Sequence, residues 1–329
     1  MKANNPTIKK MLIGMSLLAC SALPATSQAS LNLFQSYTGN VAMSSDGFGS
    51  LSNTGTISAS VPAGSTVVAA YLYSSTFFTT GTPSVSLGGS AVSFGPRVAN
   101  GTACCDLASF RADVTSIVSP TINGGAGGVY NFNVTETGLG NNTDGEALVV
   151  IYENAALPNA TVGILDGFAS VTGDSANINF ANALDPNDPG FFAEMILGIG
   201  FSCCNQRSRV DVNGVLMTEN AGNNDDSTDI GEANGNLITV GSFDDAYSPA
   251  NPDYASDSEK YDLSPFVSAG DTSINIRTSN ASQDDNIFLA GFYVDGEATI
   301  VTTPEPGILA LMGLGLLGVI SAGRTRRRS

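Results

Sequence analysis

The sequence predicts an all-β protein built from one or two antiparallel, jelly-roll-like β-sandwich lobes. Short runs of Val, Ile, Phe and Tyr alternate with segments of Gly, Ser, Thr, Asn and Asp, which are typical turn residues. Between the two ends of the chain, no stretch keeps the apolar period of a helix. About a dozen runs of strand length follow one another, and many short strands joined by turns are typical of a sandwich.

Two runs predict strands that are buried on both faces, namely Thr66–Ser75 and Ala147–Tyr152. Val129–Thr135 alternates between apolar and polar residues, which predicts a strand with one exposed face. Gly88-Gly89 separates two short apolar runs and predicts a hairpin turn. The other predicted elements are strands at 83–87, 91–94, 161–165, 176–180, 194–201, 210–217, 237–240, 273–278 and 288–294, and a single helical turn at 113–118.

The first 29 residues have the three parts of a secretory signal peptide, which we expect to be helical. Three lysines precede the apolar run Met11–Ala19, and Ser27-Gln28-Ala29 ends the segment with small residues. This pattern predicts export, with cleavage by signal peptidase between Ala29 and Ser30. The alternative is a lipoprotein box ending at Cys20, in which case Cys20 carries a lipid.

The end of the chain combines the triplet Pro304-Glu305-Pro306, the uncharged apolar run Gly307–Gly323 and an arginine-rich tail. The run has 17 residues, the short limit of a transmembrane helix, and arginines after such a helix are typical of its cytoplasmic end. Together the three features resemble the PEP-CTERM sorting signal of Gram-negative bacteria. The resemblance implies recognition by an exosortase-type membrane protease at the inner membrane, removal of the tail, and delivery to the cell surface or an extracellular polysaccharide matrix. The alternative is an ordinary single-pass anchor.

The remainder of the chain is long enough for two ordinary domains. Asn154–Asn159, with its proline and two asparagines, is the best candidate linker. A weak repeat suggests duplication, because a Cys-Cys pair precedes both Arg111–Val114 and Arg209–Val212. The predicted parts are residues 1–29 (signal peptide), 30–155 (first lobe), 156–303 (second lobe, with acidic loops) and 304–329 (sorting signal).

The charge of the chain restricts its partners. Between Ser30 and Thr303 there are 29 acidic and six basic residues, and phosphate binding needs clustered Lys or Arg, so nucleic acid is excluded. Clusters of Asp and Asn in irregular segments supply the hard oxygen ligands that Ca²⁺ takes, although the same residues are common in solvated turns. If Ca²⁺ is a cofactor, we expect paired acids to bind it, namely Asp225, Asp226, Asp284 and Asp285.

Four cysteines remain once the signal peptide is removed, and they form the vicinal pairs Cys104-Cys105 and Cys203-Cys204. In an oxidising compartment these are disulfide candidates. Four cysteines allow three connectivities, of which two join the pairs and one makes two vicinal disulfides. We favour a link between the lobes. A zinc site is the alternative, but zinc ligands normally have a Cys-x-x-Cys spacing.

Several segments of the body carry a second resemblance, among them VVAAYLYSS, SFRADVTSIV, RVDVNGVLMTENAGNNDDSTD and DDNIFLAGFYVDGEA. They are similar to an uncharacterised family of secreted bacterial domains that precede various anchors. The resemblance covers most of the body, and it implies an extracellular β-rich domain. It implies no particular activity.

The chain contains no histidine, which excludes Ser-His-Asp and Cys-His catalysis and His-ligated metals. We therefore expect no enzyme, but a structural or adhesive surface protein linked to exopolysaccharide or biofilm. The first alternative is a calcium-dependent carbohydrate-binding module. The second is a glycoside hydrolase, with Glu146, Glu153 and Glu194 as the candidate carboxylates.

Overall fold

The structure is a computed structural model that describes residues 30–50, 52–100, 105–138, 142–170, 173–202, 207–222, 237–254, 256–280 and 286–304. The described chain is mostly β-strand, and every strand pairing in it is antiparallel. The strands form four sheets, which we name A to D. The all-β prediction is confirmed.

The first lobe contains sheets B and C and one short helix, α2 (Thr115–Ile122). Sheet B has the order β2-β10-β4-β8-β7, with bounds β2 (Val41–Gly49), β10 (Thr143–Glu153), β4 (Thr66–Thr76), β8 (Ala108–Asp113) and β7 (Val98–Ala99). Sheet C has the order β3-β9-β5-β6, with bounds β3 (Thr54–Val61), β9 (Gly128–Thr137), β5 (Ser84–Leu87) and β6 (Ser90–Ala91).

The second lobe contains sheets A and D and the 3-10 helix η2 (Ser264–Phe266). Sheet A has the order β1-β11-β19-β13-β16, with β17 also paired to β13; the bounds are β1 (Leu31–Gly39), β11 (Ala160–Gly167), β19 (Asn286–Asp295), β13 (Ala193–Ser202), β16 (Leu237–Val240) and β17 (Lys260–Asp262). Sheet D has the order β15-β14-β18-β12-β20, with bounds β15 (Val215–Ala221), β14 (Ser208–Val212), β18 (Ser273–Asn280), β12 (Asp174–Phe180) and β20 (Ala298–Pro304).

Each lobe has the strand order of a jelly roll. Numbered along the chain, strands β2, β3, β4, β5, β6, β8, β9 and β10 lie in the order 1-8-3-6 in sheet B and 2-7-4-5 in sheet C. Strands β11, β12, β13, β14, β15, β16, β18 and β19 repeat this order in sheets A and D. Two Greek-key sandwiches of the same topology therefore follow one another along the chain.

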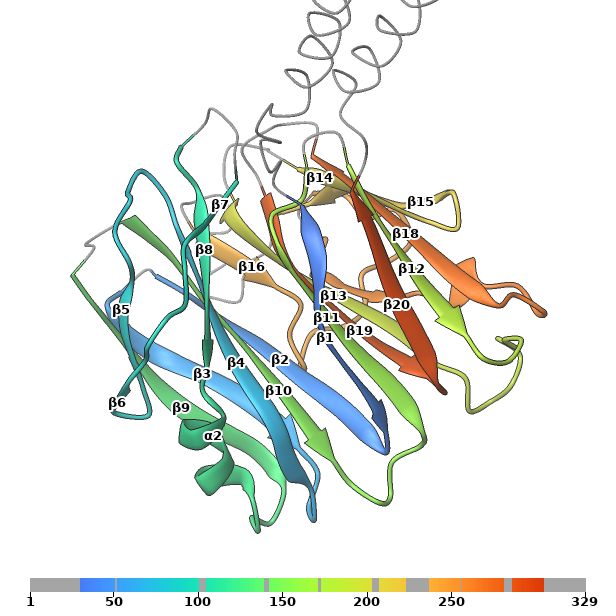
Figure 1. The fold of residues 1–329 in the computed structure, drawn as a ribbon, viewed down its shortest axis with the longest axis horizontal. Coiled ribbons are helices and arrows are strands. Elements are labelled where there is room, and N and C mark those ends of the chain that lie inside the picture. Colours follow the sequence, from blue (N-terminus) through green and yellow to red (C-terminus); the bar gives the residue numbers. More distant parts are fainter. Residues whose placement is uncertain are drawn as a thin grey trace, which may run out of the picture.

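The four sheets stack as layers in the order C, B, A, D, from left to right in Figure 1. Three apolar cores fill the spaces between them. Leu72 and Val150 face sheet C, Val149 and Ile151 face sheet A, and Met195 faces sheet D. Sheets A and B are thus covered on both faces, which explains why β4 and β10 consist almost entirely of buried residues.

The predicted division near residue 155 separates most strands of the first lobe from those of the second. One strand lies on the other side of the division, because β1 pairs with β11 at the edge of sheet A. At the edge of sheet D, β20 pairs with β12. Whether the lobes are independent domains stays a prediction.

Most of the strand predictions agree with the structure, and the hairpin around Gly88-Gly89 forms between β5 and β6. The single strand predicted at 210–217 is wrong. Asn213-Gly214 turns the chain there, and β14 and β15 form a hairpin. The turn predicted at 113–118 is a helix of eight residues, α2.

The predicted helices of the signal peptide and of the C-terminal span lie outside the described residues. Within the described ranges, no helix is long and apolar enough to cross a membrane.

Candidate functional site

A groove of about 260 Å³ lies where sheets A, B and C meet. We call it the tyrosine groove. Tyr152 of β10 comes from sheet B, Tyr293 of β19 and Glu194 of β13 from sheet A, and Ser60 of β3 from sheet C. The other lining residues are Ala42, Met43, Ser44, Ser45, Leu157, Ser242, Phe243 and Lys260.

Glu194 is the centre of this groove. It lies directly across from Tyr293 in the β13–β19 pairing. The hydroxyl of Tyr247, a half-exposed residue after β16, donates to Oε2 of Glu194 at 2.8 Å. Burial and then the negative charge of Glu194 raise the pKa of Tyr247 and of Tyr152, and burial raises the pKa of Tyr293 to about 12. The three phenols therefore remain protonated donors around one carboxylate.

Aromatic packing and one lysine complete the groove. The rings of Phe192 and Tyr293 lie with centroids 4.5 Å apart, which holds the Tyr293 ring in place. Lys260 Nζ lies 5.6 Å from the Tyr247 ring centroid and donates to the carbonyl groups of Phe243 and Asp245, each at 3.2 Å. The groove thus offers aromatic faces, hydroxyl groups, one carboxylate and one cation, which together can bind a ligand rich in hydroxyl groups.

The groove is distant from the two ends of the described body. Ser30 Oγ donates to Asp174 Oδ1 at 3.1 Å, and Asp174 is the register partner of Pro304, so both ends meet at one pole. Leu31 pairs with Gly167 of β11, and Tyr293 pairs with Val162 of the same strand, five residues away. At about 3.3 Å per residue, this separates the groove from that pole by about 17 Å along the strand.

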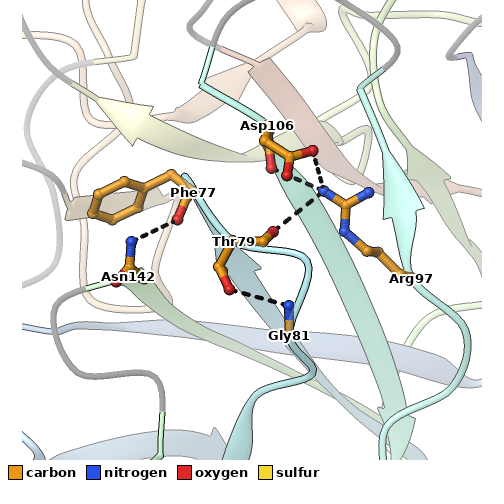
Figure 2. A network of polar contacts seen from close by, with 6 residues as sticks. All are labelled: Phe77, Thr79, Gly81, Arg97, Asp106 and Asn142. Atoms are coloured by element: carbon orange, nitrogen blue, oxygen red, sulfur yellow. Dashed lines mark hydrogen bonds and ion pairs between the residues drawn. The ribbon is translucent and has the colours of Figure 1, made fainter.

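The cysteine loop lies at the pole opposite the groove. Cys105 is disulfide-bonded, and the residue at the other end of the bond is outside the described residues. Figure 2 shows the polar contacts of the segments beside this loop. Arg97 donates to Asp106 Oδ1 at 2.7 Å and to the carbonyl group of Thr79 at 3.4 Å. The cross-link predicted between Cys104, Cys105, Cys203 and Cys204 therefore stays a prediction.

The other predicted sites fall largely outside the described residues. This holds for Ala29, Glu305, Pro306 and the four calcium candidates, Asp225, Asp226, Asp284 and Asp285. Pro304 is the last residue of β20, so the triplet begins at the end of a paired strand. In the described part of the chain, no group of three or more His, Cys, Asp or Glu residues is arranged to hold a metal ion.

The structure places two of the three candidate carboxylates far apart. Glu146 and Glu153 are seven residues apart in β10, about 23 Å, whereas a catalytic pair needs roughly 5–9.5 Å. Glu146 is fully buried, and Glu194 alone of the three lines the groove. Arg111 forms an ion pair with Asp166. Sequence reasoning missed Tyr247, Tyr293 and Lys260, because they come from segments that are distant along the chain.

The final segment gives the clearest comparison with known proteins. Residues 302–328 match the family model of the PEP-CTERM protein-sorting motif. The chain carries a PEP-CTERM motif. This motif supports an exported protein that is processed by exosortase-type machinery and associated with the surface or membrane of a Gram-negative bacterium.

The body has no comparably informative relative, since no curated protein matches the chain. The major capsid protein P2 from bacteriophage PM2 is 10% identical, with 78% of this chain and 98% of that chain covered and a TM-score of 0.22. A structure titled BspA_C_WT is 8% identical, with 84% and 96% covered and a TM-score of 0.18. At these scores, neither likeness indicates a shared fold or function.

Proposed function

We propose that this PEP-CTERM protein is a structural or adhesive component of an extracellular matrix, and that it binds polysaccharide through the tyrosine groove without cleaving it. The sorting motif supports the location. The observation that carries the binding function is the arrangement of Tyr152, Tyr247 and Tyr293 around Glu194. The groove lies at the pole opposite the sorting motif, where a tethered protein meets its surroundings.

The chemistry of the groove suits a sugar chain. Tyrosine rings present flat apolar faces to the C–H side of a sugar ring, and their hydroxyl groups can donate to its oxygens. Glu194 can accept from two sugar hydroxyl groups, and Lys260 can donate to a third or pair with an acidic sugar. The groove lacks a large apolar lining, so an oily ligand fits it less well than a polar one.

Cleavage is not part of the proposal. Glycoside hydrolysis uses two carboxyl groups across the scissile bond. Of the described residues that line the groove, only Glu194 carries a carboxylate. A hydrolase is therefore the weaker candidate, and turnover of polysaccharide that a Glu194→Gln variant abolishes is the result that favours it.

Binding is tested by affinity electrophoresis of the exported protein in gels containing extracellular polysaccharide of the host. Tyr247→Ala removes a half-exposed ring and the hydrogen bond to Glu194, so we expect at least a tenfold weaker affinity. The matched control is Phe78→Ala, which removes an exposed aromatic ring at the opposite pole and should bind like the natural protein. Equal affinities of all three proteins contradict the groove assignment.

Repeating the measurement in EGTA distinguishes calcium-dependent binding from binding in the tyrosine groove. Binding that needs Ca²⁺ and survives Tyr247→Ala favours the predicted acidic loops over the groove. No retardation with or without Ca²⁺ excludes a carbohydrate-binding function for these polysaccharides.

Sorting is tested by mass spectrometry of the intact exported protein. Exosortase-type processing predicts a mature form that begins at Ser30 and lacks Arg324–Arg328. A mature protein that retains these arginines indicates an ordinary membrane anchor instead. Deletion of the exosortase gene provides the control. Without the exosortase, the protein should keep the mass of its C-terminal tail.

A further inference from the structure

Asp174 holds the first residues of the described body at the pole where the two chain ends meet. It is the first residue of β12 and only 4% exposed. Ser30 Oγ donates to its Oδ1 at 3.1 Å, and the backbone N–H of Leu31 donates to its Oδ2 at 3.2 Å. The backbone N–H of Ser170 donates to the same Oδ2 at 2.6 Å. A carboxylate from the middle of the chain thus binds a residue that lies 144 positions earlier.

The backbone of Ser30 is held on its other side as well. Its carbonyl oxygen packs against Gly167 of β11, where an added Cβ atom would clash with it. The same oxygen accepts a hydrogen bond from the side-chain amide of Asn32 at 3.1 Å. The start of the described body is therefore fixed between β11 and β12.

The backbone nitrogen of Ser30 must lie close to the Asp174 carboxylate. It is three covalent bonds from Ser30 Oγ and three from the nitrogen of Leu31, and atoms three bonds apart are separated by at most about 3.8 Å. Those two atoms lie 3.1 and 3.2 Å from the carboxylate oxygens. The nitrogen of Ser30 is therefore within about 7 Å of the carboxylate, and rotation about the Cα–C bond can bring it closer once Ala29 is gone.

The predicted signal-peptide cleavage changes the charge of this nitrogen. Hydrolysis breaks the C–N bond between Ala29 and Ser30, and water supplies the hydroxyl group of the new carboxyl group and a proton to the nitrogen. At neutral pH the carboxyl group loses its proton and the amine gains one, so the mature chain begins with an ammonium group. A neutral N–H thus becomes a cation beside a buried carboxylate, whose charge is costly to bury without compensation.

We propose that Asp174 is the binding site of the new N-terminus, and that the ammonium group of Ser30 forms an ion pair with its carboxylate once the signal peptide is removed. The inference rests on cleavage between Ala29 and Ser30, and it is independent of the tyrosine groove. The ion pair stabilises the mature protein relative to its precursor. It does so at the register partner of Pro304, where the sorting triplet begins. Cleavage before Cys20 instead leaves Ser30 inside the chain, without an ammonium group.

Two other charged side chains of the described residues lie near this pair. Arg277 of β18 approaches from one side, because an added Cβ atom at Gly173 would lie 3.5 Å from its guanidinium group. Asp166 of β11 lies across from β1 and forms an ion pair with Arg111. An arginine and an aspartate paired with an arginine both keep their charges between pH 7 and 10. A titration in this range at this pole is therefore expected from the amine.

The test measures the pKa of the N-terminal amine in the exported protein. After residue 29 the chain contains one lysine, Lys260, so reductive methylation with ¹³C-formaldehyde labels two amines in a mature chain that begins at Ser30. NMR of the methyl signals from pH 6 to 10 should give an amine pKa at least one unit above the ordinary value of about 7.7–8.0. Asp174→Asn should return the pKa to the ordinary range. The matched control is Ser30→Ala, which loses the Oγ hydrogen bond but should keep the raised pKa.

Insertion of Gly-Ser between Ala29 and Ser30 provides a second variant, which also serves if Asp174→Asn does not fold. It moves the ammonium group two residues away and leaves Asp174 in place. A raised amine pKa contributes stability that is complete below the ordinary pKa and is lost as pH rises through the raised value. Calorimetry should therefore give the natural protein a Tm about 3 °C above that of the insertion variant at pH 7, and no difference at pH 10.

Equal amine pKa values in the natural protein and in either Asp174→Asn or the insertion variant overturn the proposal. A mature form that does not begin at Ser30 also overturns it, and mass spectrometry of the exported protein detects this case. Polysaccharide binding is measured separately, so its failure leaves this result unaffected.

Discussion

At the scale of single residues, the buried acids distinguish this protein. Asp46 of β2 accepts hydrogen bonds from the backbone N–H of Ser58 and from Ser242 Oγ, so it connects β2 to β3 and to the loop after β16. Burial raises the pKa of Asp46 to about 7, and the charge of Asp244 adds to the effect. An acid whose pKa is higher in the folded state than in the unfolded state destabilises the fold as pH rises between the two values.

We therefore expect Asp46→Asn to stabilise the protein at neutral pH. Below about pH 3, both states of the natural protein hold the proton to a similar extent, and the variant should have nearly the natural free energy of unfolding. Between pH 4 and 7 the natural protein should lose stability that the variant keeps, reaching a difference of about 2–4 kcal/mol at pH 8. Urea unfolding across this pH range is the measurement. A pH-independent loss in the variant contradicts the expectation.

Asp244→Asn serves as the control for this argument. It removes the neighbouring charge that raises the pKa of Asp46 but leaves Asp46 in place. A smaller gain in the same direction is expected at pH 8. If Asp244→Asn and Asp46→Asn have opposite effects, the pKa of Asp46 has another cause.

At the scale of elements, the β14–β15 hairpin shows how a turn overrides an apolar pattern. The run 210–217 is sufficiently apolar to predict one strand, but Asn213 and Gly214 both adopt positive φ, 50° and 78°. Two such residues form the tight turn that hairpins prefer, and Asn-Gly is its usual sequence. The turn returns the chain along sheet D, where β14 pairs with both β15 and β18.

Gly214→Ala tests this turn. A Cβ atom at Gly214 meets no other atom within 4 Å, so the cost is purely conformational, about 1 kcal/mol. Calorimetry should show Tm lowered by about 2–4 °C. Gly190→Ala is the matched control, because Gly190 is an exposed glycine without positive φ and should change Tm little. Equal effects of the two substitutions contradict the assigned turn.

At the scale of the whole molecule, the two lobes are joined by a common core and by neighbouring loops. The rings of Phe77 and Phe78, which follow β4, lie 5.2 and 5.7 Å from the ring of Phe201 near the end of β13. The backbone N–H of Phe78 donates to the carbonyl group of Cys105 at 2.6 Å. Cys105 thus lies near the point where the chain continues from Phe201 towards Cys203.

Peptide mapping of the exported protein under non-reducing conditions should therefore find Cys105 linked to Cys203 or Cys204. Such a bond closes a loop of about 100 residues, which corresponds to roughly 4–5 kcal/mol in the chain-entropy estimate. Reduction should lower Tm accordingly. A Cys104–Cys105 vicinal disulfide, found in the same map, contradicts a link between the lobes.

The repeated jelly-roll order also clarifies the possible duplication. The two Arg-x-Asp-Val segments noted in the sequence fall at β8 and β14, which are the sixth strand of one lobe and the fourth of the other. They are not equivalent positions. The repeat is in the topology, and the sequence similarity does not correspond to it.

The sequence by itself determined the fold class, the buried central strands and the sorting motif, because these depend on local composition and on consecutive residues. The strands it missed, such as β3 and β20, have few large apolar side chains, and each obtains its pairing from a distant partner. The tertiary structure alone decided the stacking of four sheets, the tyrosine groove and the contact of Ser30 with Asp174. These features bring together residues that are distant along the chain or belong to different sheets, and no local pattern specifies such contacts.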